Sequence, residues 1–125
     1  MNRKKLPCSG EMIQKIAAEY GTPFYLYYEQ GIRNGLKGLS DAFAWCPNFY
    51  EYFAVKATPN PWIMKLLREL GVGADCSSMA ELVLSEAAGL KGEEIVFSSN
   101  DTPYEEYRKA MELGAIINLD DISHI

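Results

Sequence analysis

The chain has 125 residues, 48% of them hydrophobic and 23% charged, an ordinary composition for a globular domain with its own core. Its net charge of -5 and pI near 4.9 argue against a nucleic-acid partner, because no basic stripe is present to neutralise phosphates. No apolar run reaches the roughly 18 residues of a membrane helix, so we expect a cytoplasmic protein with no membrane partner.

The amino-terminal part predicts two helices separated by a short strand. Apolar residues at helical spacing predict a helix over residues 9–20, which Gly21 ends. Residues 24–28 are aromatic and β-prone, and residues 31–43 place apolar side chains on one side of a second helix. Three cysteines without C-x-x-C spacing indicate neither a disulfide framework nor a metal site.

From residue 49 onward the sequence predicts a regular βα repeat. We expect four strands and three intervening helices: strands 49–55, 72–75, 95–98 and 115–119, and helices 61–70, 79–88 and 103–113. Alternating strands and helices with short connections predict a parallel sheet. This spacing alone leaves a (β/α)8 barrel and a doubly wound sheet both open.

Helix start and stop signals accompany this repeat. Asn60 precedes a proline, Ser78 has Glu81 three residues on, and Thr102 precedes another proline, all of which are typical N-terminal signals. Matching stops are expected at three glycines, which are Gly71, Gly89 and Gly114.

Lys56 is the residue whose position points to chemistry. It follows a strand rich in aromatic and β-branched residues, just before a helix, where we expect its amine to be half desolvated. Such an amine is nucleophilic and can form a Schiff base with an aldehyde. From position alone, a solvated lysine at a strand exit is the plainer alternative.

The stretch from Phe53 to Leu82 resembles the pyridoxal-phosphate-dependent decarboxylases of the alanine-racemase-like fold, diaminopimelate decarboxylases above all. The lysine motif, the Gly73-Ala74-Asp75 step and residues 22–27 and 95–100 carry the resemblance. It implies the N-terminal half of a (β/α)8 TIM barrel: a helix and lead-in strand over residues 1–28, then βα units over residues 29–125, with the family's C-terminal β-domain absent.

The resemblance also assigns site residues. It implies that Lys56 holds pyridoxal 5'-phosphate, that Asp75 lies near this lysine and assists proton transfers, and that Ala54 leaves room for the pyridine ring. It places Glu81 at the cofactor as well. Each assignment has an alternative, because Asp75 could be a turn residue, Ala54 could pack the barrel, and the Ser78–Glu81 pair forms a capping box without any catalysis.

The expected reaction of the full-length family member is decarboxylation of a diamino acid, with meso-diaminopimelate favoured, and ornithine or arginine as alternatives. The family implies a homodimer. We expect the 125-residue chain to be inactive by itself, or to be a non-catalytic remnant. A half-barrel exposes strand edges, which predicts self-association or a complementary chain.

Overall fold

The computed structural model describes residues 6–124 and divides the chain into two compact units, Met1–Ala42 and Phe43–Ile125. The first unit contains helices α1 (Gly10–Tyr20) and α2 (Glu29–Ala42). Ser9 begins α1 by accepting a hydrogen bond from the Met12 amide at 3.2 Å. Among residues 6–124, no helix combines the length and apolarity that crossing a membrane requires.

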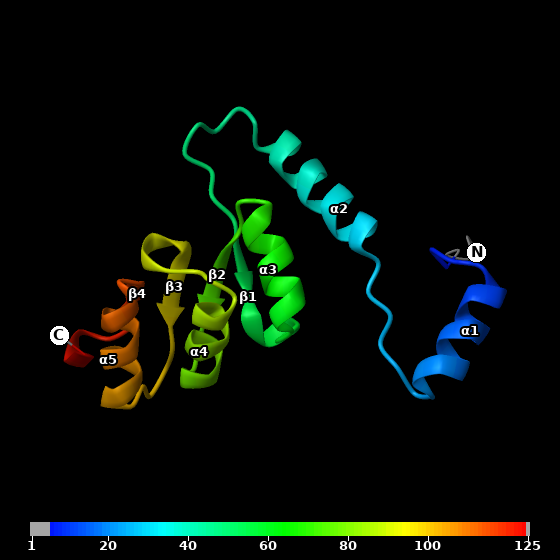
Figure 1. The fold of residues 1–125 in the computed structure, drawn as a ribbon. Helices are drawn as coiled ribbons and strands as arrows, with labels where there is room; N and C mark the ends of the chain where they lie inside the picture. Colours follow the sequence, from blue (N-terminus) through cyan, green and yellow to red (C-terminus); the bar gives the residue numbers. More distant parts are fainter. Residues whose placement is uncertain (1–5, 125) are drawn as a thin grey trace. The chain divides into compact units, whose positions relative to one another are not determined.

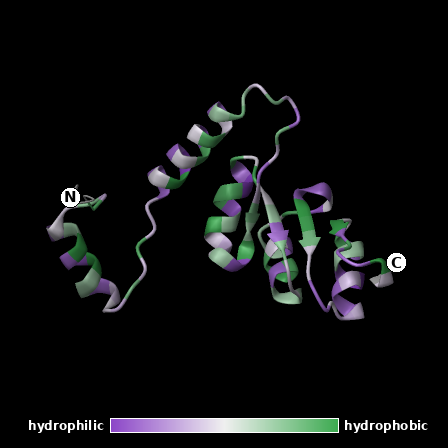
Figure 2. Cartoon of the chain, turned by 180° about the vertical axis from the view of Figure 1, so that it is seen from behind, coloured by the Kyte–Doolittle hydropathy of each residue, from purple (hydrophilic) through white to green (hydrophobic). Residues whose placement is uncertain are grey.

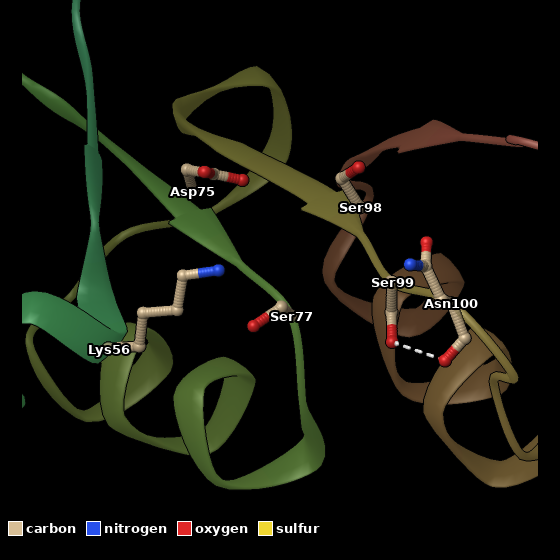
Figure 3. A pocket seen from close by; sticks show the side chains of 6 residues that line it. All are labelled: Lys56, Asp75, Ser77, Ser98, Ser99 and Asn100. Atoms are coloured by element: carbon tan, nitrogen blue, oxygen red, sulfur yellow. Dashed lines mark hydrogen bonds between the residues drawn. The ribbon is translucent and has the colours of Figure 1, made fainter.

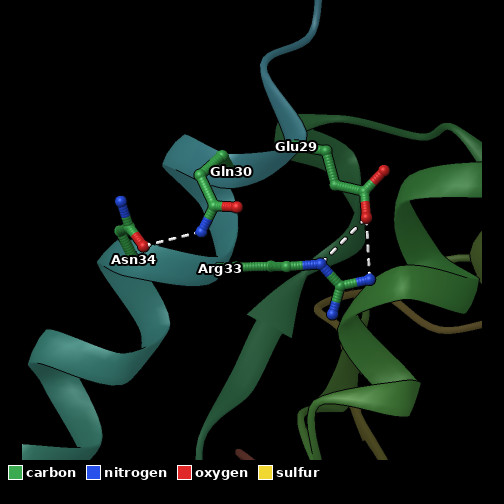
Figure 4. Close-up of polar contacts among 4 residues, drawn as sticks. All are labelled: Glu29, Gln30, Arg33 and Asn34. Atoms are coloured by element: carbon green, nitrogen blue, oxygen red, sulfur yellow. Dashed lines mark hydrogen bonds and ion pairs between the residues drawn. The ribbon is translucent and has the colours of Figure 1, made fainter.

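Polar pairs one turn apart line α2. Arg33 forms an ion pair with Glu29 at 2.7 Å, and the Gln30 amide donates to Asn34 at 2.9 Å (Figure 4). Lys37 and Asp41 form a further pair at 2.7 Å. Each such pair stabilises an exposed helix by roughly 0.2–0.5 kcal/mol. The helix is therefore supported locally although none of its side chains is buried.

The predicted strand at residues 24–28 is wrong. The structure shows these residues without regular secondary structure, and the Tyr25 side chain is 91% exposed. A strand needs a neighbour to receive its backbone hydrogen bonds, and the described residues of the first unit contain no strand that could serve as one. High β-propensity alone did not decide the structure of this segment.

The second unit is a parallel α/β structure (Figure 1). Its described residues form a four-stranded sheet in the order β1 (Tyr52–Ala54), β2 (Gly73–Cys76), β3 (Ile95–Ser98) and β4 (Ile116–Asn118). Helices α3 (Pro61–Glu69), α4 (Met79–Ala87) and α5 (Tyr104–Leu113) connect them. Short 3-10 turns η1 (Val55–Ala57), η2 (Gly92–Glu94) and η3 (Ile122–His124) complete the unit. The predicted βα repeat is confirmed, with β1 and β4 shorter than expected.

The two faces of the sheet differ in what covers them. Helices α3, α4 and α5 lie on one side of the sheet (Figures 1 and 2). Ala74, Cys76, Ile95 and Phe97 are fully buried, and register together with the Cys76–Ser85 contact to α4 places them on this side. Phe97 also contacts the edge of the Tyr107 ring, with centroids 6.0 Å apart. The core of this unit therefore lies between the sheet and its helices.

The opposite face carries the alternate residues of each strand. Ala54, Asp75, Val96 and Ile116 are neighbours in register across the four strands, so their side chains share this face. None of the four is fully buried, and Ile116 is 44% exposed. Within residues 43–124, no helix of the second unit covers this face, which is the side that a closed barrel would turn inward.

The helix starts follow the sequence signals at two of three places. Asn60 Oδ1 accepts from the Trp62 amide at 2.9 Å, and Ser78 Oγ accepts from the Glu81 amide at 3.4 Å. The third prediction is wrong, because Thr102 donates to the Ser99 carbonyl instead of capping α5. The predicted stops are confirmed by positive φ angles at the three expected glycines, Gly71, Gly89 and Gly114.

Candidate functional site

A polar pocket lies at the carboxyl ends of β1, β2 and β3. It has a volume of about 320 Å³, at the lower end of the usual range for small-molecule sites. Figure 3 shows its lining residues, which are Lys56, Asp75, Ser77, Ser98, Ser99 and Asn100. In parallel α/β folds, ligands bind at this end of the sheet.

The local fold explains why Lys56 reaches this pocket. β1 ends at Ala54, and η1 follows at once, so that Val55 turns inward with 0% exposure while Lys56 remains at the surface. The Lys56 amine points toward the space between Asp75 and Ser77 (Figure 3). Within residues 6–124, no hydrogen bond or ion pair holds this amine, which leaves it available to a ligand.

The expectation that the Lys56 amine is half desolvated is wrong for this structure. The residue is exposed and not half desolvated, because β1 is an edge strand and no further strand of the described sheet stands beside it. Lys56 follows β1, as predicted, and lies in the 3-10 turn η1, so strand alternation does not relate its direction to that of Ala54.

Asp75 stands where the sequence placed it. It lies near the end of β2, is half-buried, and pairs in register with Ala54 of β1. Its carboxylate lines the pocket together with the Lys56 amine (Figure 3). No ion pair joins the two in the part of the chain that the structure describes. The proton-transfer role expected of Asp75 stays a prediction.

Ala54 and Glu81 do not line this pocket. The Glu81 carboxylate accepts from the Ser77 amide at 3.0 Å and from the Ser77 and Ser78 hydroxyls at 3.1 Å each. The Ser78 cap on the Glu81 amide is one half of the capping box that the sequence indicated. The other half differs, because the Glu81 carboxylate accepts from the amide of Ser77 and not from that of the capping residue Ser78. A role of either residue at the cofactor stays a prediction.

A second carboxylate reaches the same end of α4. Glu106, in the first turn of α5, accepts a hydrogen bond from the Met79 amide at 2.9 Å. The positive end of the α4 dipole therefore already faces two acidic side chains from the protein. Lys109 and Glu86, whose Nζ and Oε2 atoms are 2.7 Å apart, join α5 to α4 further along.

Cys76 lies directly between two pocket residues in sequence but faces the core. Its Sγ lies 3.2 Å from the Ser85 Oγ of α4, and both side chains are fully buried. Burial raises the pKa of the Cys76 thiol to about 11, so the thiol is neutral at physiological pH. A neutral, buried thiol is inert, and its role is to hold the end of β2 against α4.

The sequence analysis ended a strand at residue 98 and included residues 95–100 in the resemblance, but it missed Ser77 as a lining residue and Asn118 altogether. The Asn118 Nδ2 donates to Ser98 Oγ at 3.0 Å across β3 and β4. A polar residue closing a predicted parallel strand beside another such residue was the signal that could have found Asn118. Asp101, just after the pocket loop, has a left-handed φ of 53°, a region that aspartate tolerates.

The lining side chains suit an oxygen-rich aldehyde. A primary amine can bind an aldehyde carbon, and hydroxyl and amide groups can donate hydrogen bonds to oxygen atoms. Of the three lining hydroxyls, those of Ser77 and Ser99 already donate to Glu81 and to the Asn100 carbonyl. The Ser98 hydroxyl and the Asn100 carboxamide remain as donors in the pocket of the Lys56 amine. Fold and site together define a parallel α/β protein with an amine-bearing ligand pocket at the carboxyl edge of its sheet.

Comparison with known proteins specifies this class further. Residues 30–125 match the family model described as pyridoxal-dependent decarboxylase, pyridoxal binding domain. The chain is 43% identical to Protein TabA of Pseudomonas amygdali pv. tabaci, covering 90% of this chain and 26% of that protein. It is 36% identical to a diaminopimelate decarboxylase of Deinococcus radiodurans, covering 90% of this chain and 29% of the relative.

A solved structure shows the same fold. The diaminopimelate decarboxylase from M. jannaschii in co-complex with L-lysine superposes with a TM-score of 0.82 at 32% identity, over 88% of this chain and 27% of that one. The chain thus belongs to the family of pyridoxal-dependent decarboxylases, and it matches their pyridoxal binding domain. The predicted family and its pyridoxal cofactor are confirmed. The chain spans less than a third of the length of the curated relatives it matches.

Proposed function

We propose that Lys56 is the covalent anchor for pyridoxal phosphate in a decarboxylase of diamino acids, with meso-diaminopimelate as the preferred substrate and lysine as the product. The observation that carries this proposal is the Lys56 amine, without a hydrogen bond or ion pair in the described residues, at the carboxyl edge of the sheet. Relatives named diaminopimelate decarboxylase support the choice of substrate.

The covalent step needs only groups that are present or supplied with the cofactor. The neutral Lys56 amine attacks the aldehyde carbon, its nitrogen replaces the aldehyde oxygen, and that oxygen leaves as water. When bound, pyridoxal phosphate supplies the electron sink for the loss of carbon dioxide. Because Asp75 shares the pocket with Lys56, its carboxylate can accept the amine proton and return it.

The loop of Ser98, Ser99 and Asn100 bounds the other side of the pocket from Lys56 (Figure 3). The Ser98 hydroxyl and the Asn100 carboxamide would donate to oxygen atoms of the bound molecule, whereas the Ser99 hydroxyl donates to the Asn100 carbonyl at 3.4 Å. The carboxylates of Glu81 and Glu106 lie at the α4 terminus, so this helix end is closed to a phosphate group. We therefore place the phosphate away from α4.

A direct test is to incubate the chain with pyridoxal phosphate, reduce the adduct with borohydride, and locate the label by peptide mass spectrometry. Exposed lysines react weakly with any aldehyde, so Lys65, exposed and beside the Trp62 ring, serves as the internal control. We expect Lys56 to be labelled at a pyridoxal phosphate concentration at least about tenfold lower than Lys65.

Lys56→Arg keeps the positive charge and removes the nucleophile, and it should abolish the label at this site only. Equal labelling of Lys56 and Lys65 in the wild-type chain would refute the anchor. Substrate choice is tested on protein that holds pyridoxal phosphate but has not been reduced, by supplying meso-diaminopimelate, ornithine and arginine and measuring carbon dioxide release.

A second role is favoured by a different surface. Tyr104, Tyr107, Met111, Ile117 and Leu119 form an apolar pocket of about 340 Å³ between α5 and the edge strand β4. In the described sheet, no strand pairs with the outer edge of β4. This edge beside an apolar pocket supports the proposal that additional polypeptide, or a second copy of the chain, completes a barrel. Sedimentation velocity should then show concentration-dependent association, and a monodisperse monomer would count against this role.

A further inference from the structure

A hydrogen bond between Ser98 and Asn118 crosses from β3 to β4 at the rim of the pocket, and which of the two residues donates it matters for ligand binding. Ser98 closes β3 and Asn118 closes β4, and the two are register partners. The Asn118 Nδ2 donates to Ser98 Oγ over 3.0 Å. Ser98 lines the pocket, whereas Asn118 stands behind it on the neighbouring strand.

Both side chains share the face of the sheet that the helices leave uncovered. Ser98 is two residues beyond Val96, and Val96 is the register partner of Asp75. Because side chains two apart on a strand point to the same side, Ser98 and Asn118 face the same way as Asp75. The bond is thus part of the surface that surrounds the Lys56 amine.

A serine hydroxyl has one proton to donate and can accept two hydrogen bonds. With the Asn118 amide occupying an acceptor position, the Ser98 proton is not used between the two residues. Within residues 6–124, the Ser98 hydroxyl donates to no protein acceptor. The arrangement leaves one oriented O–H donor at the pocket, and an oxygen atom of a bound molecule is what it can satisfy.

We propose that Ser98 donates a hydrogen bond to an oxygen atom of pyridoxal phosphate bound at Lys56, and that Asn118 is a positioning residue that keeps the Ser98 proton free for this bond. The inference rests on the proposed function of Lys56. Its competitor is a purely structural bond that joins β3 to β4 and has no part in binding.

Asn118→Asp separates these two possibilities. The new carboxylate is nearly isosteric but can only accept, so it draws the Ser98 proton away from the pocket while still bonding the two strands. If the bond only joins the two strands, this change leaves its function intact. If the bond orients the Ser98 proton toward the pocket, this change reverses the donor direction and removes that proton from the pocket. Ser98→Ala removes the donor, and the double variant Ser98→Ala/Asn118→Asp measures the effect of the added negative charge by itself.

The measured quantity is the apparent Kd for pyridoxal phosphate, taken from the concentration dependence of the reduced label at Lys56. We expect Ser98→Ala and Asn118→Asp each to raise this Kd about three- to tenfold, which is the factor for the loss of one net hydrogen bond. Asn118→Asp should add little once Ser98 is alanine. Repeating the titration with pyridoxal, which lacks the phosphate, shows whether the accepting oxygen lies on the ring or on the phosphate.

Each failure has its own signature. If Lys56 of the wild-type chain takes no preferential label, the proposed function is refuted and this inference with it. If Lys56 is labelled but Ser98→Ala or Asn118→Asp binds like wild type, the inference alone is overturned. It is also overturned if Asn118→Asp weakens binding equally with and without Ser98, because the added charge then explains the whole effect.

Discussion

Gly73→Ala tests the packing that holds the edge strand β1 against β2. A Cβ built at Gly73 would lie 2.6 Å from the Glu94 carbonyl oxygen and 2.6 Å from Cδ1 of Tyr52. The Tyr52 ring lies over this glycine, and its hydroxyl donates to the Glu93 carbonyl at 2.7 Å. The pKa of Tyr52 is raised, mainly by burial and further by the neighbouring Tyr50 and Glu93, so its phenol stays protonated and can donate this bond.

The size of the effect follows from which atoms can move. The ring could rotate away only by breaking its bond to Glu93, and the Glu94 carbonyl belongs to the backbone. Overpacking of this kind lowers the free energy of unfolding by about 1–3 kcal/mol, and we expect the upper half of that range because one of the clashing atoms belongs to the backbone. With a urea m-value of about 1 kcal/mol/M for a small unit, the midpoint should fall by about 2 M.

The assay is urea unfolding followed by circular dichroism. Tyr52→Phe is the matched control, because it keeps the ring and removes only the hydroxyl bond, which contributes about 1 kcal/mol. We expect Gly73→Ala to lower the midpoint more than Tyr52→Phe. A wild-type midpoint for Gly73→Ala would mean that β1 and β2 do not approach as closely as the structure shows.

Three further outcomes are expected. Because burial raises the Cys76 pKa from 9.0 to about 11, the folded thiol stays neutral while the unfolded thiol ionises. The free energy of unfolding, measured in urea, should therefore fall as pH rises above 9, by about 1 kcal/mol at pH 10. In Cys76→Ala, this part of the pH dependence should disappear. Glu106→Ala should lower the free energy of unfolding by about 1 kcal/mol, because the Met79 amide loses its acceptor. Glu106→Gln should retain most of this free energy, because its carboxamide oxygen can still accept the bond. Equal losses in the two variants would contradict the cap. Gly38→Ala should stabilise α2 by about 0.5–1 kcal/mol, since nothing lies within 4 Å of the added methyl group. The measurement is helical circular dichroism, which should increase. A decreased helical signal would show that the space around residue 38 is filled.

The sequence by itself determined the features that depend on neighbouring residues along the chain. Asn60 and Ser78 cap their helices through residues two or three positions away, and Gly71 ends α3 because it adopts a positive φ easily. The βα alternation determined a parallel sheet with its polar residues at one edge. The lysine motif also placed Lys56 at a strand exit, where the pocket is found.

Tertiary structure decided whatever depends on a distant partner. Residues 24–28 have strand propensity but no partner strand among the described residues of their own unit, and Lys56 is exposed because β1 is an edge of the described sheet. The Glu106 carboxylate caps a helix that begins 27 residues earlier, and Asn118 orients a serine 20 residues away. Backbone groups and side chains take partners from whichever elements pack beside them, and no local pattern encodes that choice.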